Sequence, residues 1–123
     1  MVEPTRVLIA DDHRLFVEAL EAILDADERI EVVGTALNGE QAVRSARSLH
    51  PDVVLMDIDM PVLDGIEATR RIREELPETR VLVVTGSNAR QDVARARRAG
   101  AAAYVTKDRI AADLVGAILQ SPD

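Results

Sequence analysis

Apolar runs and amphipathic stretches alternate along the chain, and this alternation predicts its architecture. Five runs have the length and the Val, Ile, Leu and Ala content of strands: residues 6–10, 30–36, 53–57, 80–85 and 102–106. Apolar residues recur at helical spacing in the stretches that follow them, over about residues 13–24, 39–49, 66–75, 89–99 and 109–120. The pattern is typical of a parallel sheet with helices on both faces, a doubly wound (βα)5 fold.

The composition of the strands indicates their order in the sheet. Residues 53–57 and 80–85 are almost wholly apolar, which favours central strands that are buried on both faces. Residues 30–36 mix polar and apolar positions, which suits an edge strand. We expect the strand order 2-1-3-4-5, in which the first and third strands are neighbours.

Polar residues follow four of the five predicted strands. They are Asp11 and Asp12 after the first strand, Asp57 after the third, Thr85 after the fourth and Lys107 after the fifth. Ligands of an open α/β sheet bind beyond the carboxyl ends of its strands, where the strand order reverses. These five side chains are therefore the candidate site.

The three acids indicate a metal site. Converging carboxylates repel one another unless a cation or a raised pKa neutralises them, and oxygen ligands completed by water suit Mg²⁺. Asp11 and Asp12 also precede a predicted helix, which one of them could cap. Capping does not account for Asp57 at the end of another strand, so we favour the metal site.

Lys107 and Thr85 indicate which chemical group would bind next to such a metal. Lys107 is the only lysine in an arginine-rich chain, and an ammonium is a compact point charge. A metal on one side of Asp57 and an ammonium with a hydroxyl on the other fit a phosphoryl group between them. No glycine-rich phosphate loop is present, which argues against a nucleotide. Asp57 is then placed as a nucleophile that forms an acyl phosphate.

Composition narrows the class of protein. The 123 residues suffice for one domain, and a net charge of −7 argues against a nucleic-acid-binding face on this chain. There is no cysteine, no secretory signal and no apolar run of the roughly 18 residues that a membrane span needs. We therefore expect a cytoplasmic protein without membrane contact.

Four motifs carry a resemblance to a known family: ADDH at 10–13, MDIDMPVLDG at 56–65, VVTG at 83–86 and GAAAYVTK at 100–107. In this order and spacing the chain resembles, from end to end, the receiver domain of two-component response regulators, which has a flavodoxin-like fold. The phrases DDHRLF and GAAAYVTKD are most similar to the NarL/FixJ subfamily, whose members usually carry a C-terminal helix-turn-helix domain. We expect residues 1–123 to be one receiver domain, with that output domain absent.

The resemblance implies a role for each site residue. Asp57 would accept a phosphoryl group from a histidine kinase, and Thr85 and Lys107 would bind the phosphoryl oxygens. Tyr104, the only tyrosine, would turn inward when Thr85 moves. The Mg²⁺ ligands would be Asp11, Asp12, Asp57 and the backbone carbonyl of Asp59.

The resemblance also implies partners. They are the cognate histidine kinase and, on phosphorylation, a second copy of the chain, whereas DNA would be contacted only through the output domain. The alternative is a stand-alone receiver that acts by protein contact. Phosphorylation from small donors and dephosphorylation would be reactions of the chain on itself, so we do not expect an enzyme in the usual sense.

Two other protein classes share part of the pattern. The DID of residues 57–59 superficially fits the nucleophile and acid of haloacid dehalogenase-type phosphatases. That pattern has Thr or Val at the position of Pro61, and it normally lies on the first strand of a larger protein. A flavodoxin-like FMN binder would need aromatic side chains to stack on the flavin, yet only 2% of the residues are aromatic.

Three local predictions concern loops. We expect Gly65 to adopt a backbone dihedral that other residues avoid. We expect His13 to start the first helix with its ring partly in water. Most receivers have proline in a cis peptide after the lysine, but Asp108 stands here, and a non-proline cis bond costs about 2.5–4 kcal/mol. The bond after Lys107 is therefore expected to be trans.

Overall fold

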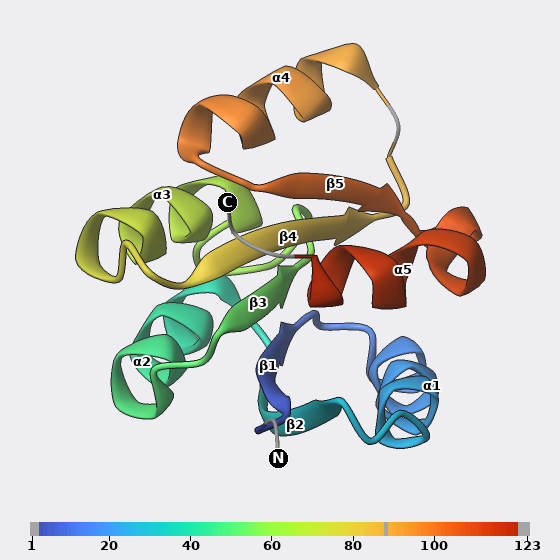
Figure 1. The fold of residues 1–123 in the computed structure, drawn as a ribbon. Coiled ribbons are helices and arrows are strands. Elements are labelled where there is room, and N and C mark those ends of the chain that lie inside the picture. The colour runs from blue at the N-terminus through green and yellow to red at the C-terminus, as the bar shows by residue number, and fades with distance from the viewer. Residues whose placement is uncertain (1–2, 88, 121–123) are drawn as a thin grey trace.

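The computed structural model describes residues 3–87 and 89–120, which form strands and helices in alternation (Figure 1). The strands are β1 (Thr5–Ala10), β2 (Ile30–Ala36), β3 (Val53–Met56), β4 (Arg80–Thr85) and β5 (Ala103–Thr106). The helices are α1 (Arg14–Asp25), α2 (Gly39–Leu49), α3 (Gly65–Glu75), α4 (Arg90–Ala99) and α5 (Ile110–Leu119), with a short 3-10 helix, η1 (Lys107–Arg109), before α5. Each boundary lies within about one residue of its prediction.

The strands are parallel and lie in the order β2-β1-β3-β4-β5, so the predicted topology is confirmed. β2 is an edge strand, as its mixed composition indicates. Met56 at the end of β3 pairs with Ala10 of β1 on one side and with Val83 of β4 on the other. This register brings the residues that follow β1 and β3 to one edge of the sheet.

Helices cover both faces of the sheet (Figure 1). Successive residues of a strand point to opposite faces, so each strand packs against helices on both sides. Val7 and Ile9 pack in a cluster with residues of α1 and α5. Leu8 and Val54 belong to a second cluster with residues of α2 and α3, and α4 packs in a smaller cluster around Val83. Both sets of strand residues are buried, which explains why the central strands are apolar without alternation.

Side-chain caps start two of the helices. Asn38 accepts a hydrogen bond from the backbone N–H of Gln41 at 2.8 Å, and Asp64 accepts one from Glu67 at 2.9 Å. Each bond satisfies an N–H that the first turn of a helix leaves without a partner. The ends of α2 and α3 nearest the candidate site are thereby fixed.

The loop between β3 and α3 corrects the prediction for Gly65. Among the described glycines, only Gly100 has a positive φ, of 105°. Gly65 is needed for room instead, since a Cβ there would lie 1.9 Å from the backbone oxygen of Asp57. The unusual backbone belongs to the exposed Val62, whose φ of 70° lies in the left-handed region that branched side chains disfavour.

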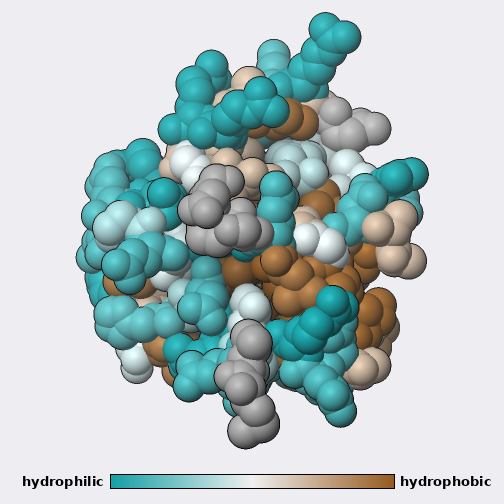
Figure 2. All heavy atoms as spheres, in the orientation of Figure 1, coloured by the Kyte–Doolittle hydropathy of each residue, from teal (hydrophilic) through white to brown (hydrophobic). Residues whose placement is uncertain are grey.

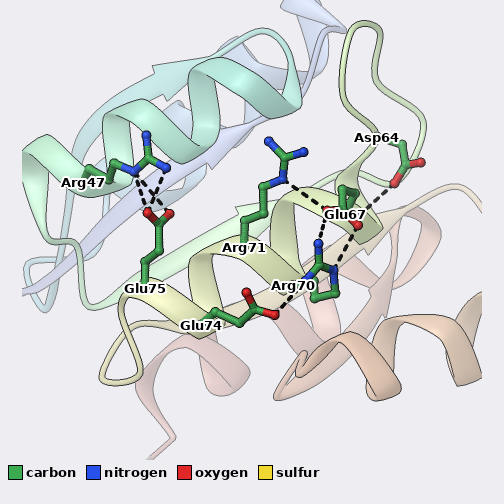
Figure 3. A network of polar contacts seen from close by, with 7 residues as sticks. All are labelled: Arg47, Asp64, Glu67, Arg70, Arg71, Glu74 and Glu75. Atoms are coloured by element: carbon green, nitrogen blue, oxygen red, sulfur yellow. Dashed lines mark hydrogen bonds and ion pairs between the residues drawn. The ribbon is translucent and has the colours of Figure 1, made fainter.

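An exposed set of ion pairs connects α2 and α3 (Figure 3). Glu67 pairs with Arg70 and, at 3.1 Å, with Arg71, and these hydrogen bonds lower the pKa of Glu67 to about 2. Arg70 also contacts Glu74 at 2.6 Å. A pair at 2.8 Å joins Arg47 of α2 to Glu75 of α3. We call the six residues the α3 network: Arg47, Glu67, Arg70, Arg71, Glu74 and Glu75.

The helix α5 has mostly small apolar residues on its exposed side, with Asp113 as its one charged side chain. It buries Ile110, Leu114 and Ile118 while leaving Ala112 and Gly116 exposed. Figure 2 shows hydrophobic surface gathered over α5, with hydrophilic side chains around it. Neither α5 nor any other helix in the described part of the chain is long and apolar enough to cross a membrane.

Candidate functional site

The edge of the sheet at the ends of β1 and β3 positions the candidate residues. Asp57 is the first residue after β3, and its backbone N–H donates to the carbonyl of Ala10 at 2.9 Å. Asp11 follows Ala10 directly, and its own N–H donates to the carbonyl of Ala36 at 3.0 Å. Because β1 and β3 are neighbours in register, the carboxylates that follow them meet.

Four side chains gather at this edge, and we call them the acid site: Asp11, Asp12, His13 and Asp57. Each offers one ligand atom, and these atoms lie within 4.8 Å of one another. Asp11 and Asp57 are buried, whereas Asp12 and His13 are exposed. The structure thus brings together the three carboxylates that the sequence placed at strand ends.

Lys107 reaches the same site from the end of β5. Its Nζ lies 2.9 Å from Oδ2 of Asp11 and 3.8 Å from Oδ2 of Asp57. The ammonium also lies over the ring of Phe16 from α1, 4.2 Å from the ring centroid, which is cation–π geometry. Only 23% of the lysine side chain is exposed, so its charge is held in place. The peptide bond after Lys107 is trans, the form that is favoured when no proline follows.

The carboxylate of Asp57 is incompletely neutralised. Its side chain is 3% exposed, and its Oδ2 is buried without a hydrogen-bond partner among residues 3–87 and 89–120. The side-chain nitrogens of His13 and Lys107 lie 3.6 and 3.8 Å from Oδ2, beyond hydrogen-bond distance. Burial, and after it the charge of Asp11, raises the pKa of Asp57, although Lys107 acts in the opposite direction.

His13 lies directly before α1, with 60% of its side chain exposed, so the prediction for it is confirmed. The sequence did not indicate that its ring also contacts the acids. Nδ1 of His13 lies 2.8 Å from Oδ1 of Asp11 and 3.3 Å from Oδ1 of Asp12. The hydrogen bond with Asp11 raises the pKa of His13. Asp11 Oδ1 accepts the backbone N–H of His13 as well, at 2.8 Å.

The donor set fits Mg²⁺. Three carboxylates and the ammonium of Lys107 leave two formal negative charges, which one divalent cation neutralises. The buried Oδ2 of Asp57 has no hydrogen-bond partner in the described part of the chain, and a cation would satisfy it. Carboxylate oxygens are the ligands that Mg²⁺ prefers. Asp11, Asp12 and Asp57 are in position to hold it, whereas the side chain of Asp59 is exposed and outside the acid site.

Thr85 and Tyr104 are linked through the loop that follows β4. The hydroxyl of Thr85 is buried at the end of β4, and the backbone N–H of Ser87 approaches it at 3.5 Å. The hydroxyl of Tyr104, from β5, donates to the carbonyl of Ser87 at 2.7 Å. Ser87 in turn donates its hydroxyl to Asp92 of α4 at 2.6 Å. Thr85 and Tyr104 therefore both contact Ser87.

Sequence patterns did not predict three contacts of these residues. Phe16 carried only a helical core signal, although Lys107 lies over its ring. The contact of Ser87 with Tyr104 was not predicted, because a backbone carbonyl makes it. His13 directly follows two aspartates, but it was interpreted as the start of a helix rather than as a ligand.

Known proteins match almost the whole chain. Residues 7–119 match the family model of the response regulator receiver domain. The chain is 37% identical over 119 residues to the nitrate/nitrite response regulator protein NarL of Escherichia coli strain K12, and 39% identical over 114 residues to the transcriptional regulatory protein LnrK of Bacillus subtilis. These matches cover 97% and 93% of this chain but 55% and 52% of the two relatives. The chain therefore spans about half the length of the curated relatives it matches.

Solved structures agree with the fold. The signal receiver domain of the putative response regulator NarL from Mycobacterium tuberculosis matches with a TM-score of 0.91 and 35% identity, over 96% of this chain and 95% of that one. The response regulator domain of Thermotoga maritima CheB matches with a TM-score of 0.87 and 35% identity, over 94% of each chain. The chain therefore belongs to the response regulator receiver domain family of two-component systems, and its curated relatives place it among the NarL-like members.

Proposed function

We propose that Asp57 accepts a phosphoryl group from the phosphohistidine of a histidine kinase in a Mg²⁺-dependent reaction. The observation that carries the proposal is the buried Oδ2 of Asp57, which has no hydrogen-bond partner among the described residues and lies 3.8 Å from Nζ of Lys107. A divalent cation on this oxygen would leave the other carboxylate oxygen of Asp57 available as the nucleophile. Membership of the receiver family supports the same assignment.

Different residues of this chain have different roles in the phosphoryl transfer. A carboxylate oxygen of Asp57 attacks phosphorus, the phosphorus–nitrogen bond breaks, and its electron pair leaves with the imidazole of the donor. Bound Mg²⁺ would be held by Asp11, Asp12 and Asp57, with the backbone carbonyl of Asp59, and would supply charge neutralisation for the transferred oxygens.

Lys107 and Thr85 would contact the transferred group from the side of β4 and β5. Lys107 places its ammonium 3.8 Å from Asp57, where negative charge increases. The buried hydroxyl of Thr85 at the end of β4 is a donor for a phosphoryl oxygen. Thr85 is the last residue of β4 and Lys107 directly follows β5, so the sheet fixes both backbones relative to Asp57.

A switch would follow from the contacts of Ser87. When Thr85 is drawn to the phosphoryl group, the loop after β4 moves and the hydrogen bond between Tyr104 and the carbonyl of Ser87 is remade. Tyr104 is half-buried against Val83 and Ala96 and would follow the loop inward. The surface made by α4, β5 and α5 would change for a partner.

The second part of the proposal concerns how the full-length protein responds to phosphorylation. LnrK, a relative of about twice the length, is a transcriptional regulatory protein, which supports a full-length cytoplasmic protein with a DNA-binding output domain. Phosphorylation would favour a homodimer, and the exposed apolar surface of α5 supports such contact. Light scattering before and after phosphorylation would show a doubled mass, and an unchanged mass would remove the dimer from the proposal.

Intact-protein mass spectrometry tests the chemistry. The chain is incubated with acetyl phosphate, with and without Mg²⁺, as wild type, as Asp57→Ala and as Asp59→Ala. We expect one phosphoryl adduct that needs Mg²⁺ and Asp57. The control variant Asp59→Ala should keep the adduct, because only its backbone carbonyl is assigned to the metal.

Two outcomes would contradict the proposal. An adduct on Asp57→Ala would place the phosphoacceptor elsewhere, and no adduct under any condition would leave a receiver fold that signals by protein contact alone. Steady turnover of a small phosphate ester would instead favour a phosphatase. We expect self-phosphorylation and self-dephosphorylation only, without turnover of a separate substrate.

A further inference from the structure

His13 places one ring nitrogen against all three carboxylates of the acid site. Its Nδ1 lies 2.8 Å from Asp11, 3.3 Å from Asp12 and 3.6 Å from Asp57. The other histidine, His50, lies beyond the opposite end of the sheet at the end of α2 and is outside the acid site. A single imidazole is therefore grouped with the oxygens assigned to Mg²⁺.

A second observation at the same place points to a missing partner. Oδ2 of Asp57 is buried and makes no hydrogen bond, although His13 Nδ1 and Lys107 Nζ lie 3.6 and 3.8 Å away. Neither nitrogen is close enough to donate, yet both are too close for a layer of water between them and the carboxylate. An ion bound between the carboxylates and His13 would satisfy this oxygen.

We propose that His13 is a fourth ligand of the acid site, which gives the site one nitrogen and three oxygen donors and a preference for divalent transition metals such as Mn²⁺ over Mg²⁺. The proposal rests on the cation site of the proposed function and adds the identity of its preferred metals. Imidazole binds first-row transition ions well, whereas Mg²⁺ binds oxygen and keeps much of its water. A neutral imidazole adds no charge, so the site keeps the two negative charges that match a divalent ion.

The local backbone supports ligation. Oδ1 of Asp11 accepts the backbone N–H of His13 at 2.8 Å, which holds the turn that directs the ring toward the acids. This bond is independent of the ring, so it remains when Nδ1 turns from the carboxylate to an ion. The ligating form carries its proton on Nε2, and a side chain that is 60% exposed lets water accept from it.

Calorimetric titration of the whole chain with Mn²⁺ and with Mg²⁺ tests the preference. Wild type is compared with His13→Ser, because serine is a favourable residue before a helix and should leave α1 intact. His50→Asn is the matched control, because asparagine tolerates the left-handed backbone of His50, with φ 47°. Even an outer-shell partner of a metal is worth about 10–100-fold in affinity, so His13→Ser should weaken Mn²⁺ by at least about tenfold and leave Mg²⁺ nearly unchanged.

Pulsed electron paramagnetic resonance of the Mn²⁺-loaded chain tests ligation directly, independently of phosphorylation. Wild type and His50→Asn should show nitrogen modulation from an imidazole on the ion, and His13→Ser should show none. Absence of nitrogen modulation in wild type, with Mn²⁺ bound equally by all three proteins, would overturn the ligand assignment and leave the proposed function standing. Failure of every protein to bind either cation would overturn both.

Discussion

Two groups of charged residues in this molecule have opposite electrostatic properties. The α3 network is exposed and balanced, with three carboxylates matched by three guanidinium groups on neighbouring turns and helices (Figure 3). The acid site is half buried and unbalanced, because its three carboxylates face a single ammonium, that of Lys107. The pKa shifts follow this contrast, since the pKa of Glu67 is lowered and that of Asp57 is raised.

The contrast separates carboxylates that neighbouring guanidinium groups already neutralise from carboxylates that lack enough positive partners. Exposed ion pairs contribute little to stability, because water already solvates both partners. Buried carboxylates without enough partners oppose folding, and the unfavourable interaction is relieved only when a ligand arrives. The acid site is therefore the region where binding should change stability, and the α3 network is the region where substitution should not.

The largest effect should come from the backbone beside Asp57. In Gly65→Ala the new Cβ would meet the Asp57 carbonyl at 1.9 Å, so the loop must move. Overpacking typically costs about 1–3 kcal/mol and occasionally more, and we expect the upper end because the contact is with backbone. Gly116→Ala on α5, where a Cβ meets nothing, should instead stabilise by about 0.5–1 kcal/mol. Thermal unfolding of the two variants measures both, and equal effects would show that the site backbone is not tightly packed.

Bound metal should reverse which of the two proteins, wild type or Asp57→Asn, is more stable. Without metal the amide should be more stable on the order of 1 kcal/mol, because it removes a buried charge whose oxygen has no partner. With Mg²⁺ at a hundredfold excess over its Kd, wild type should gain about 2.7 kcal/mol and the variant far less. Chemical denaturation with and without Mg²⁺ gives both numbers. A variant that is less stable in both conditions would contradict the idea that the acid site opposes folding.

A smaller effect is expected from the loop at Val62. A left-handed conformation costs a non-glycine residue about 1–2 kcal/mol, and asparagine tolerates it best. Val62→Asn should therefore stabilise the protein by about 1 kcal/mol and keep the phosphoryl adduct. Leu15→Asn also removes an exposed apolar side chain but from helical backbone, so it should bring no gain. An equal gain in both variants would assign the effect to surface apolarity rather than to φ.

The smallest effect should come from the α3 network. Glu67 has a lowered pKa of about 2, so its contribution to stability is present above the unfolded value of 4.5 and is lost as pH falls toward 2. Removing Arg70 and Arg71 together should move the Glu67 pKa toward 4.5 in an NMR titration. Any difference in melting temperature from wild type should be small at neutral pH and vanish near pH 2. A large difference at neutral pH would contradict the comparison.

Sequence patterns predicted the features that depend on the backbone and on periodicity. The alternation of strands and helices, the central strands and the strand order follow from burial on one or both faces, and these fix which strand ends meet. The meeting of Asp11, Asp12 and Asp57 with Lys107 follows from topology alone, because all four stand at strand ends. A site of this kind is predictable without knowledge of side-chain conformation.

Contacts that depend on side-chain direction or on local space were not predictable. The ring of His13 turns toward Asp11 because one carboxylate oxygen binds both its backbone and its imidazole. Tyr104 contacts a backbone carbonyl, which carries no residue signature. Gly65 was expected to adopt an unusual backbone dihedral. Glycine is required there instead because a side chain would clash with the Asp57 backbone. That clash arises only when α3 begins against the end of β3.

The hydrogen bond of Tyr104 gives the protein an intrinsic optical signal. The chain has one tyrosine and no tryptophan, so its near-ultraviolet emission arises from a single ring. That ring is half-buried, and its hydroxyl is attached to the loop after β4 through the Ser87 carbonyl. Any rearrangement of this loop changes the solvent and the hydrogen-bond partner of the fluorophore together. The time course of the proposed switch could therefore be followed in the unlabelled protein, by stopped-flow mixing, at a position outside the acid site.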